Sequence, residues 1–202
     1  MKKRTVALLM ACMIMVGAAA GGTIAWLTAQ SATVVNTFTI GEVEITLTET
    51  DALDQGGGQF TKSFKVSPGE DITKDPKVTV LAGSEACYLF VRIQESDQFT
   101  DLKTASKLNY AIAAGWNSVD GHDGYYYRKV DAIAEDAPAA EFPVLLNNLV
   151  EVGDDIVNAD VDGETVTLTF SAAAIQSENM TGADEDAKVA TAFANLPGGF
   201  TA

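Results

Sequence analysis

The sequence predicts an all-β protein: a jelly-roll-like β-sandwich with short surface helices and a C-terminal helix, preceded by a signal-peptide helix. Three observations predict this class. Short apolar runs alternate with polar or threonine residues, which is typical of half-buried strands. Turn-forming dipeptides separate these runs. A basic and then apolar N-terminal segment has the composition of an export signal.

The N-terminal segment begins with basic residues at positions 2–4, continues with an apolar run over 6–20, and ends in small residues. The cations stay with the anionic inner leaflet while the apolar run enters the membrane. We therefore expect residues 1–25 to be a signal peptide that is cleaved between Ala25 and Trp26.

Two alternatives to this cleavage stay open. The segment 6–27 is about long enough to remain as a membrane anchor, which takes roughly 20 apolar residues, although its glycines weaken it as a permanent helix. The run Leu9-Met10-Ala11-Cys12 is loosely similar to a lipoprotein cleavage box, but apolar residues continue beyond the cysteine. We favour a removed signal over both.

The remaining residues, 26–202, suit a single β-sandwich domain, since domains typically hold about 100 to 200 residues. Removal of the signal leaves ten of the 13 basic residues and all 28 acidic ones, a formal charge of −18. This charge repels nucleic-acid phosphates and anionic lipids. We expect no nucleic-acid partner, and membrane contact only through the signal segment before cleavage.

Strand patterns begin at residues 33–40 and 42–49, and Gly41 between them predicts a bulge or kink. The second run places Val43, Ile45 and Leu47 on one face. After a polar, glycine-rich loop, further strands are expected over 60–66, 77–81, 87–94, 125–130, 142–146 and 165–171. Turns are expected at Pro68-Gly69, Asp120-Gly121, Asp123-Gly124 and Asp162-Gly163.

Two segments favour helix. Residues 102–114 predict a short surface helix. Residues 183–196 predict a C-terminal helix that covers a sheet face or edge, because Val189, Phe193 and Leu196 recur at helical spacing and acidic residues begin the segment.

Cys87 is the single cysteine of the mature chain, so stability must come from the core and not from an internal disulfide. It lies in an apolar strand pattern, which favours a small buried hydrophobic residue over an intermolecular disulfide or a reactive thiol.

The region around the cleavage site carries a family resemblance. The segment Gly21-Gly22-Thr23-Ile24-Ala25-Trp26-Leu27-Thr28, the run Asn36-Thr37-Phe38-Thr39-Ile40-Gly41-Glu42-Val43-Glu44-Ile45, and Ser67-Pro68-Gly69-Glu70 followed by Lys74-Asp75 resemble the TasA/CalY (camelysin) family. The resemblance covers about residues 1–50 and the Pro-Gly turn. It implies a jelly-roll subunit exported through a SipW-type signal peptidase.

The resemblance also implies a function: a secreted structural protein of the cell surface or biofilm matrix, either a fibre subunit or an accessory subunit. Its partners would be copies of itself or related matrix subunits. The mature N-terminal segment of one copy would complete the sheet of the next. The candidate donor runs over 26–40, with Val35, Phe38 and Ile40 as its apolar side chains; its first part, 26–36, is either a mobile donor strand or an extra strand that awaits a partner.

The residues contain no enzyme motif. A zincin-type peptidase needs two histidines one helical turn apart, and this chain has one histidine, His122. The peptidase activity that the camelysin name implies is therefore not expected. His122 lies in a polar turn, which we favour over a catalytic arrangement with Asp120 or Asp123 and Cys87.

A calcium loop is a weak candidate. Asn158, Asp160 and Asp162 match the opening of an EF-hand loop, but its twelfth position is Thr169 and not glutamate. A hairpin turn at Asp162-Gly163 is favoured. We expect no cofactor and no firm metal site, and weak calcium binding stays open.

A carbohydrate platform is the last candidate site, formed by Trp116 and the run 125–127. In a strand, Tyr125 and Tyr127 share one face and Tyr126 points the other way, so ordinary packing is favoured. The rival function is an exported monomeric binding module for a glycan or protein ligand, or a camelysin-type peptidase without a recognisable zinc motif.

Overall fold

Antiparallel strands make up most of the computed structural model, which describes residues 43–50, 53–54, 60–61, 67–157, 160, 166–178, 180–196 and 200. All of its elements belong to one unit, residues 35–202. The strands are β1 (Ile45–Thr48), β2 (Leu53–Asp54), β3 (Phe60–Thr61), β4 (Ile72–Thr73), β5 (Lys77–Val80), β6 (Cys87–Glu95), β7 (Leu108–Asn109), β8 (Asn117–Ser118), β9 (Tyr125–Val130), β10 (Ala140–Pro143), β11 (Leu149–Val152) and β12 (Leu168–Gln176). The helices are α2 (Asp97–Thr104), α4 (Glu185–Ala194) and the 3-10 helix η1 (Leu146–Asn148).

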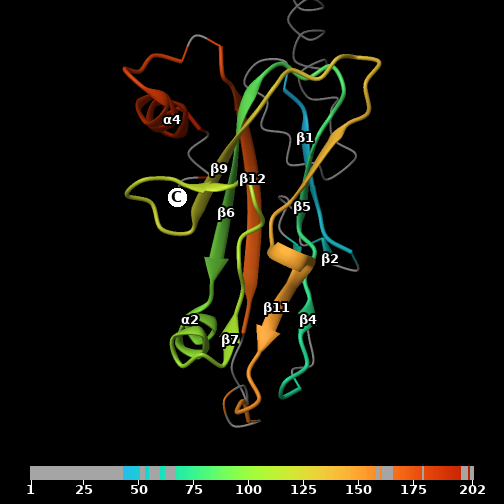
Figure 1. Cartoon of the computed structure of the whole chain (residues 1–202), viewed down its shortest axis with the longest axis vertical. Helices are drawn as coiled ribbons and strands as arrows, with labels where there is room; N and C mark the ends of the chain where they lie inside the picture. The colour runs from blue at the N-terminus through green and yellow to red at the C-terminus, as the bar shows by residue number, and fades with distance from the viewer. Residues whose placement is uncertain are drawn as a thin grey trace, which may run out of the picture. The chain divides into compact units, whose positions relative to one another are not determined.

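The first β layer is a four-stranded antiparallel sheet in the order β12-β6-β9-β8 (Figure 1). Strands β12 and β6 pair over nine residues, from Leu168 opposite Glu95 to Gln176 opposite Cys87. Strand β9 pairs with the other edge of β6. The two long strands β6 and β12 therefore form the centre and one edge of this layer.

The second β layer consists of two three-stranded sheets, β1-β5-β10 and β4-β11-β7. They are continuous along the chain, because β4 leads into β5 and β10 leads through η1 into β11. Two backbone hydrogen bonds bridge the break: Lys74 N to Asn148 O at 2.8 Å, and Val144 N to Pro76 O at 2.9 Å. Strands β2 and β3 form a separate short pair.

The main core lies between the two layers. Alternate residues of each strand face it, as expected for a sandwich. Its members from β6 are Cys87, Leu89, Val91 and Ile93, those from β12 are Leu168, Phe170, Ala172 and Ala174, and those from the second layer include Ile45, Leu47, Val78, Val80, Val150 and Val152. Val43, Ile45 and Leu47 share the buried face, as predicted.

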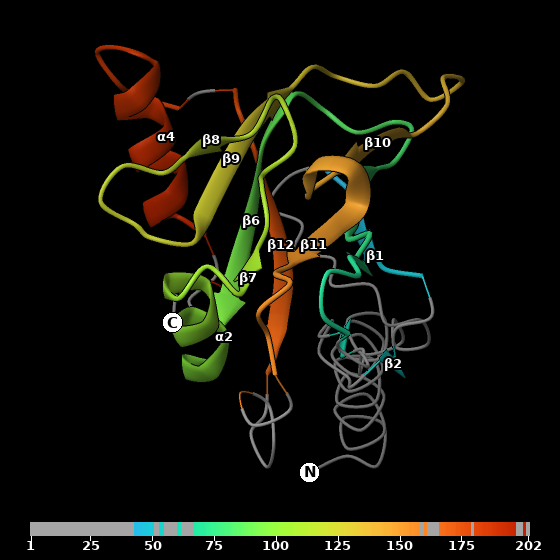
Figure 2. The same ribbon diagram turned by 60° about the horizontal axis from the view of Figure 1, so that its bottom comes forward.

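A second core covers the outer face of the four-stranded sheet, where α4 packs on β6, β9 and β12 (Figure 2). Tyr88 and Phe90 of β6 contact this core, so β6 is buried on both faces and reads as a continuous apolar run. The side chain of Asp184 caps α4 by accepting from Ala187 N at 2.9 Å. The predicted β-sandwich with a C-terminal helix is confirmed; its jelly-roll connectivity stays a prediction.

The helix predicted over residues 102–114 is wrong in position. Helix α2 begins earlier, because Ser96 caps it by accepting from Phe99 N at 3.2 Å, and Phe99 and Leu102 form its buried face. The helix stops at Ala105, and the left-handed φ of Ser106 (60°) turns the chain into β7. The apolar residue Leu108, expected on the helix, lies instead in a strand.

Several strand predictions shift. Strand β9 matches the prediction, while the strand expected over 142–146 lies at Ala140–Pro143. The last strand, β12, extends to Gln176 and includes three consecutive alanines, because burial of Ala172 and Ala174 in the main core and of Ala173 beneath α4 overrides the helical preference of alanine. Strands β2, β4, β7, β8 and β11 were not predicted. The strand expected over 33–40, the signal and residues 62–66 lie outside the described residues.

Candidate functional site

The outer edge of β12 is the longest strand edge that the described sheets leave without a strand partner. Strand β12 stands at the end of the order β12-β6-β9-β8, and it pairs only with β6 among the strands described. The edge strand at the other end, β8, has two residues, whereas β12 has nine. An edge of this length is a template for pairing with another strand.

The pairing pattern of β12 shows which of its main-chain groups point outward. Backbone hydrogen bonds from Ser96 N to Thr167 O (3.0 Å) and from Ser177 N to Ala86 O (2.8 Å) flank the ladder to β6. In an antiparallel pair every second residue bonds to the same partner, so odd-numbered residues of β12 face β6. The main-chain groups of the even-numbered residues from 168 to 176 face away.

The side chains near this edge are small and face the main core. Ala172 and Ala174 are 1% and 0% exposed and belong to the core between the layers. Strand β1, the edge of the β1-β5-β10 sheet, and strand β3 of the short β2-β3 pair contact β12. The edges of the two layers therefore meet along one side of the sandwich. An added strand there would find main-chain partners in the outward groups of β12.

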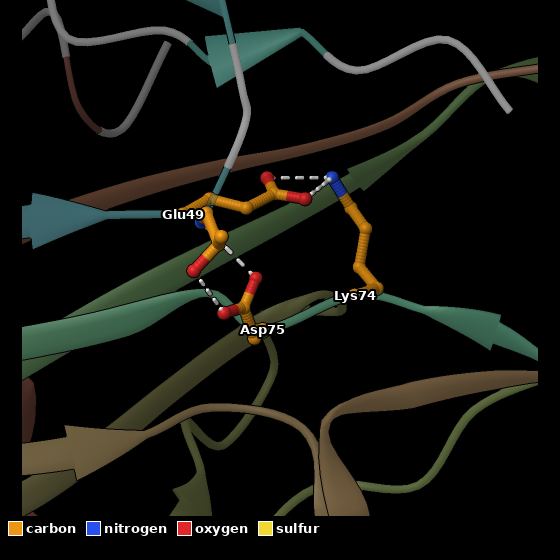
Figure 3. A network of polar contacts seen from close by, with 4 residues as sticks. Glu49, Lys74 and Asp75 are labelled. Carbon is orange, nitrogen blue, oxygen red and sulfur yellow. Dashed lines mark hydrogen bonds and ion pairs between the residues drawn. The ribbon is translucent and has the colours of Figure 1, made fainter.

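A polar network, buried at Lys74 and Glu49 and exposed at Thr50, closes the end of β1 (Figure 3). Lys74 Nζ donates to both carboxylate oxygens of Glu49, and Asp75 accepts from the backbone N and hydroxyl of Thr50 at 3.1 and 2.6 Å. The network ties β1 to the bend between β4 and β5. Lys74 and Asp75 belong to the motif that carries the family resemblance. The sequence analysis did not predict the ion pair of Glu49. The alternation that buries residues 43, 45 and 47 continues to position 49 and places the charge of Glu49 on the same buried face.

Of the weak calcium candidates, Asp160 is the one that lies in the described part of the chain. Asp160 accepts from Lys107 Nζ at 2.8 and 2.7 Å and from Val157 N at 2.8 Å. The hydrogen bond from Lys107, and then that from Val157, lowers the pKa of the Asp160 carboxyl. Asn158 and Asp162 lie outside the described residues, and within those residues no group of three His, Cys, Asp or Glu side chains is placed to hold a metal ion.

The histidine and the cysteine lie on opposite faces of the four-stranded sheet. His122 is exposed in the β8–β9 turn, and its ring centroid is 4.4 Å from that of Phe193 of α4. Cys87 faces the main core, where burial raises the pKa of its thiol to about 12. The Cys-His arrangement is therefore not formed, and the interpretation of Cys87 as a small buried residue is confirmed.

The aromatic run also splits between the faces. Tyr125 and Tyr127 face α4, whereas Tyr126 packs against the main core, as predicted. Trp116 is buried in the main core and donates from Nε1 to Pro143 O at 2.9 Å. It therefore does not extend a platform with Tyr125 and Tyr127.

The remaining site residues from the sequence lie outside the described residues. These are the cleavage residues Ala25 and Trp26 and the donor residues Val35, Phe38 and Ile40. Among the helices described, none has the length and apolar character needed to span a bilayer. In comparisons with known proteins, no family model, no curated protein and no solved structure matches the chain. The family resemblance therefore rests on the sequence motifs themselves.

Proposed function

We propose that the protein is a secreted structural subunit of the cell surface or biofilm matrix, either a fibre subunit or an accessory subunit. It assembles by strand donation with copies of itself or with related matrix subunits, after a SipW-type signal peptidase removes residues 1–25. The observation that carries this proposal is the nine-residue outer edge of β12.

The donor is the segment 26–40. An extended segment beside β12 would bond to the outward main-chain groups of its even-numbered residues, which supplies affinity without a disulfide. Phe38 and Ile40 are two residues apart and share a face in an extended chain.

Charge sets the conditions for assembly. The formal charge of −18 after cleavage makes copies repel one another, and salt screens this repulsion beyond about 10 Å at 0.1 M. Assembly through backbone pairing and apolar burial should therefore be promoted by salt.

A deletion tests the donor. The chain 26–202 and a chain that begins at residue 41, which lacks Phe38 and Ile40, are compared by size-exclusion chromatography and electron microscopy. We expect filaments from the first, and from the second a folded monomer that does not polymerise. Unchanged filaments after the deletion would contradict the donor, and a chain 26–202 that stays a closed monomer would contradict the assembly itself.

A substitution tests the acceptor. Proline at an edge position is tolerated when the lost N–H points away from the neighbouring strand. Gln176→Pro removes one outward N–H of β12, and Gln176→Ala is the matched control. We expect slower filament growth only for the proline variant, with both variants folded by circular dichroism. Equal growth of the two variants would place the acceptor elsewhere.

A further inference from the structure

A pocket of about 760 Å³ lies between the β8–β9 segment and α4, away from the outer edge of β12. Its volume falls within the range of small-ligand sites, roughly 300 to 1,000 Å³. One wall comes from β8, the following turn and β9, and the other from one face of α4. The pocket therefore joins two elements that are far apart in the sequence.

The floor of the pocket is apolar and aromatic. Phe193 and Val189 of α4 are 6% and 4% exposed, and Tyr127 of β9 is half-buried beside them. The ring of His122 lies against Phe193 at one side. A ligand that enters would remove apolar surface from water and lie close to aromatic ring faces.

The mouth of the pocket is acidic on both walls. Asp120 comes from the β8–β9 turn and Asp186 from the first turn of α4, and both are exposed. Within the described part of the chain, neither carboxylate has a hydrogen bond or an ion pair, whereas the neighbouring Glu185 bonds to Tyr88 and Lys129. No lysine or arginine lines the pocket.

We propose that this pocket binds a lysine or arginine side chain of a basic polypeptide segment. The aliphatic stem of such a side chain packs on the floor formed by Phe193, Val189 and Tyr127, and its cationic head reaches Asp120 and Asp186. The ring of Tyr127 adds a cation–π contact. Anionic ligands are repelled by the two carboxylates.

The electrostatic potential in the pocket is negative, which favours a cationic ligand. Burial first, and then the charges of Asp186 and Glu185, raise the pKa of Tyr127. The site is independent of strand donation, because its residues lie on β8, β9 and α4 and none lies on β12.

The test uses the mature chain with fluorescein-labelled hexalysine and hexaarginine at 150 mM salt, where charges more than about 8 Å apart are largely screened. The variant Asp120→Asn/Asp186→Asn is compared with Asp101→Asn/Asp136→Asn, which removes the same charge from exposed positions outside the pocket. We expect the first variant to bind about tenfold more weakly or worse, since hydrogen bonds to charged groups are strong. We expect the second to bind within about twofold of the unchanged chain. Equal weakening in the two variants would overturn the proposal.

A nuclear magnetic resonance experiment tests whether the peptides bind in the pocket. His122 is the single histidine of the chain, so its ring resonances in a nuclear magnetic resonance spectrum are unambiguous. Saturation with either peptide should shift these resonances in the unchanged chain and not in Asp120→Asn/Asp186→Asn. Binding of the neutral sugar cellohexaose that shifts them equally in both chains would assign the pocket to a glycan and overturn the proposal.

Discussion

Lys74 Nζ lies 2.8 Å from Oε1 and 2.7 Å from Oε2 of Glu49, and the two side chains are only 3% and 2% exposed. The ammonium group also lies 5.1 Å from the ring centroid of Phe170 on β12. One buried cation thus contacts β1, the β4–β5 bend and the opposite layer. Because either charge alone would be costly to bury, the pair ties the end of β1 to one position in the sandwich.

Lys74→Met should strongly destabilise the protein, because it leaves the Glu49 carboxylate buried without its counter-charge. We expect the free energy of unfolding to fall by about 3–5 kcal/mol, measured by urea denaturation. The double variant Glu49→Leu/Lys74→Met removes both charges and should recover most of this loss. A single variant within about 1 kcal/mol of the unchanged chain would contradict the role of the pair.

The Glu95 carboxylate predicts a pH-dependent contribution to stability. Burial alone would raise the pKa of Glu95, but hydrogen bonds from Lys103, Tyr110 and Thr100 outweigh it, and the net pKa is lowered. A lowered pKa in the folded state means that the stabilisation is complete above the unfolded value of about 4.3 and is lost as the pH falls through the folded value.

Glu95→Gln should therefore reduce the free energy of unfolding by about 1–3 kcal/mol at pH 7, the range for hydrogen bonds to charged groups. The difference between the variant and the unchanged chain should shrink as the pH falls below about 4. Denaturation at a series of pH values checks this. Glu141→Gln, in an ion pair whose side chains are 38% and 58% exposed, is the control and should change stability by less than about 1 kcal/mol. A constant Glu95→Gln effect across the series would contradict the assignment.

The Cys87 thiol should be unreactive in the folded protein. It is 0% exposed, and burial raises its pKa to about 12, so almost no thiolate forms at pH 8. In the mature chain we expect no modification by a thiol-specific reagent until guanidinium unfolds the protein. Rapid labelling of the native chain, or disulfide-linked dimers on a non-reducing gel, would contradict its place in the core.

The β8–β9 turn contains two glycines, Gly121 and Gly124. Comparing the alanine variants of the two positions distinguishes the cost of backbone strain from that of a steric clash. Both glycines have left-handed φ angles, +77° and +71°, so alanine at either position should cost about 1–2 kcal/mol. A Cβ at Gly124 would also lie 2.6 Å from the carbonyl oxygen of Ile93, whereas one at Gly121 meets no atom within 4 Å. Gly124→Ala should therefore lower the thermal unfolding midpoint more than Gly121→Ala. Equal shifts would mean that the turn moves to relieve the clash.

Local sequence was sufficient to predict the elements whose pattern is contained within a few neighbouring residues. The alternation in 125–130 predicted β9 and the opposite faces of Tyr126 and Tyr127, because strand side chains alternate whatever they pack against. Helix α4 was predictable from its apolar spacing and its acidic first turn. Helix α2 was predicted in the wrong place because its one strong local signal, the cap Ser96, precedes the predicted segment 102–114.

The candidate sites depend on contacts that span long stretches of chain. Asp160 had the spacing of a calcium ligand, but Lys107, 53 residues away, donates to it. The three alanines of β12 favour helix by themselves, and burial in the two cores on either face of the sheet makes them a strand.

The sequence alone determined the alternation of faces in β1 and β9, the turns that separate strands and the acidity, because these properties reside in neighbouring residues. The tertiary structure decided which edge stands without a described strand partner, which charges meet in the interior and which surface is hollowed beside α4. Those outcomes depend on how the whole chain buries its apolar surface, since burial brings together residues whose spacing in the sequence carries no signal of their contact.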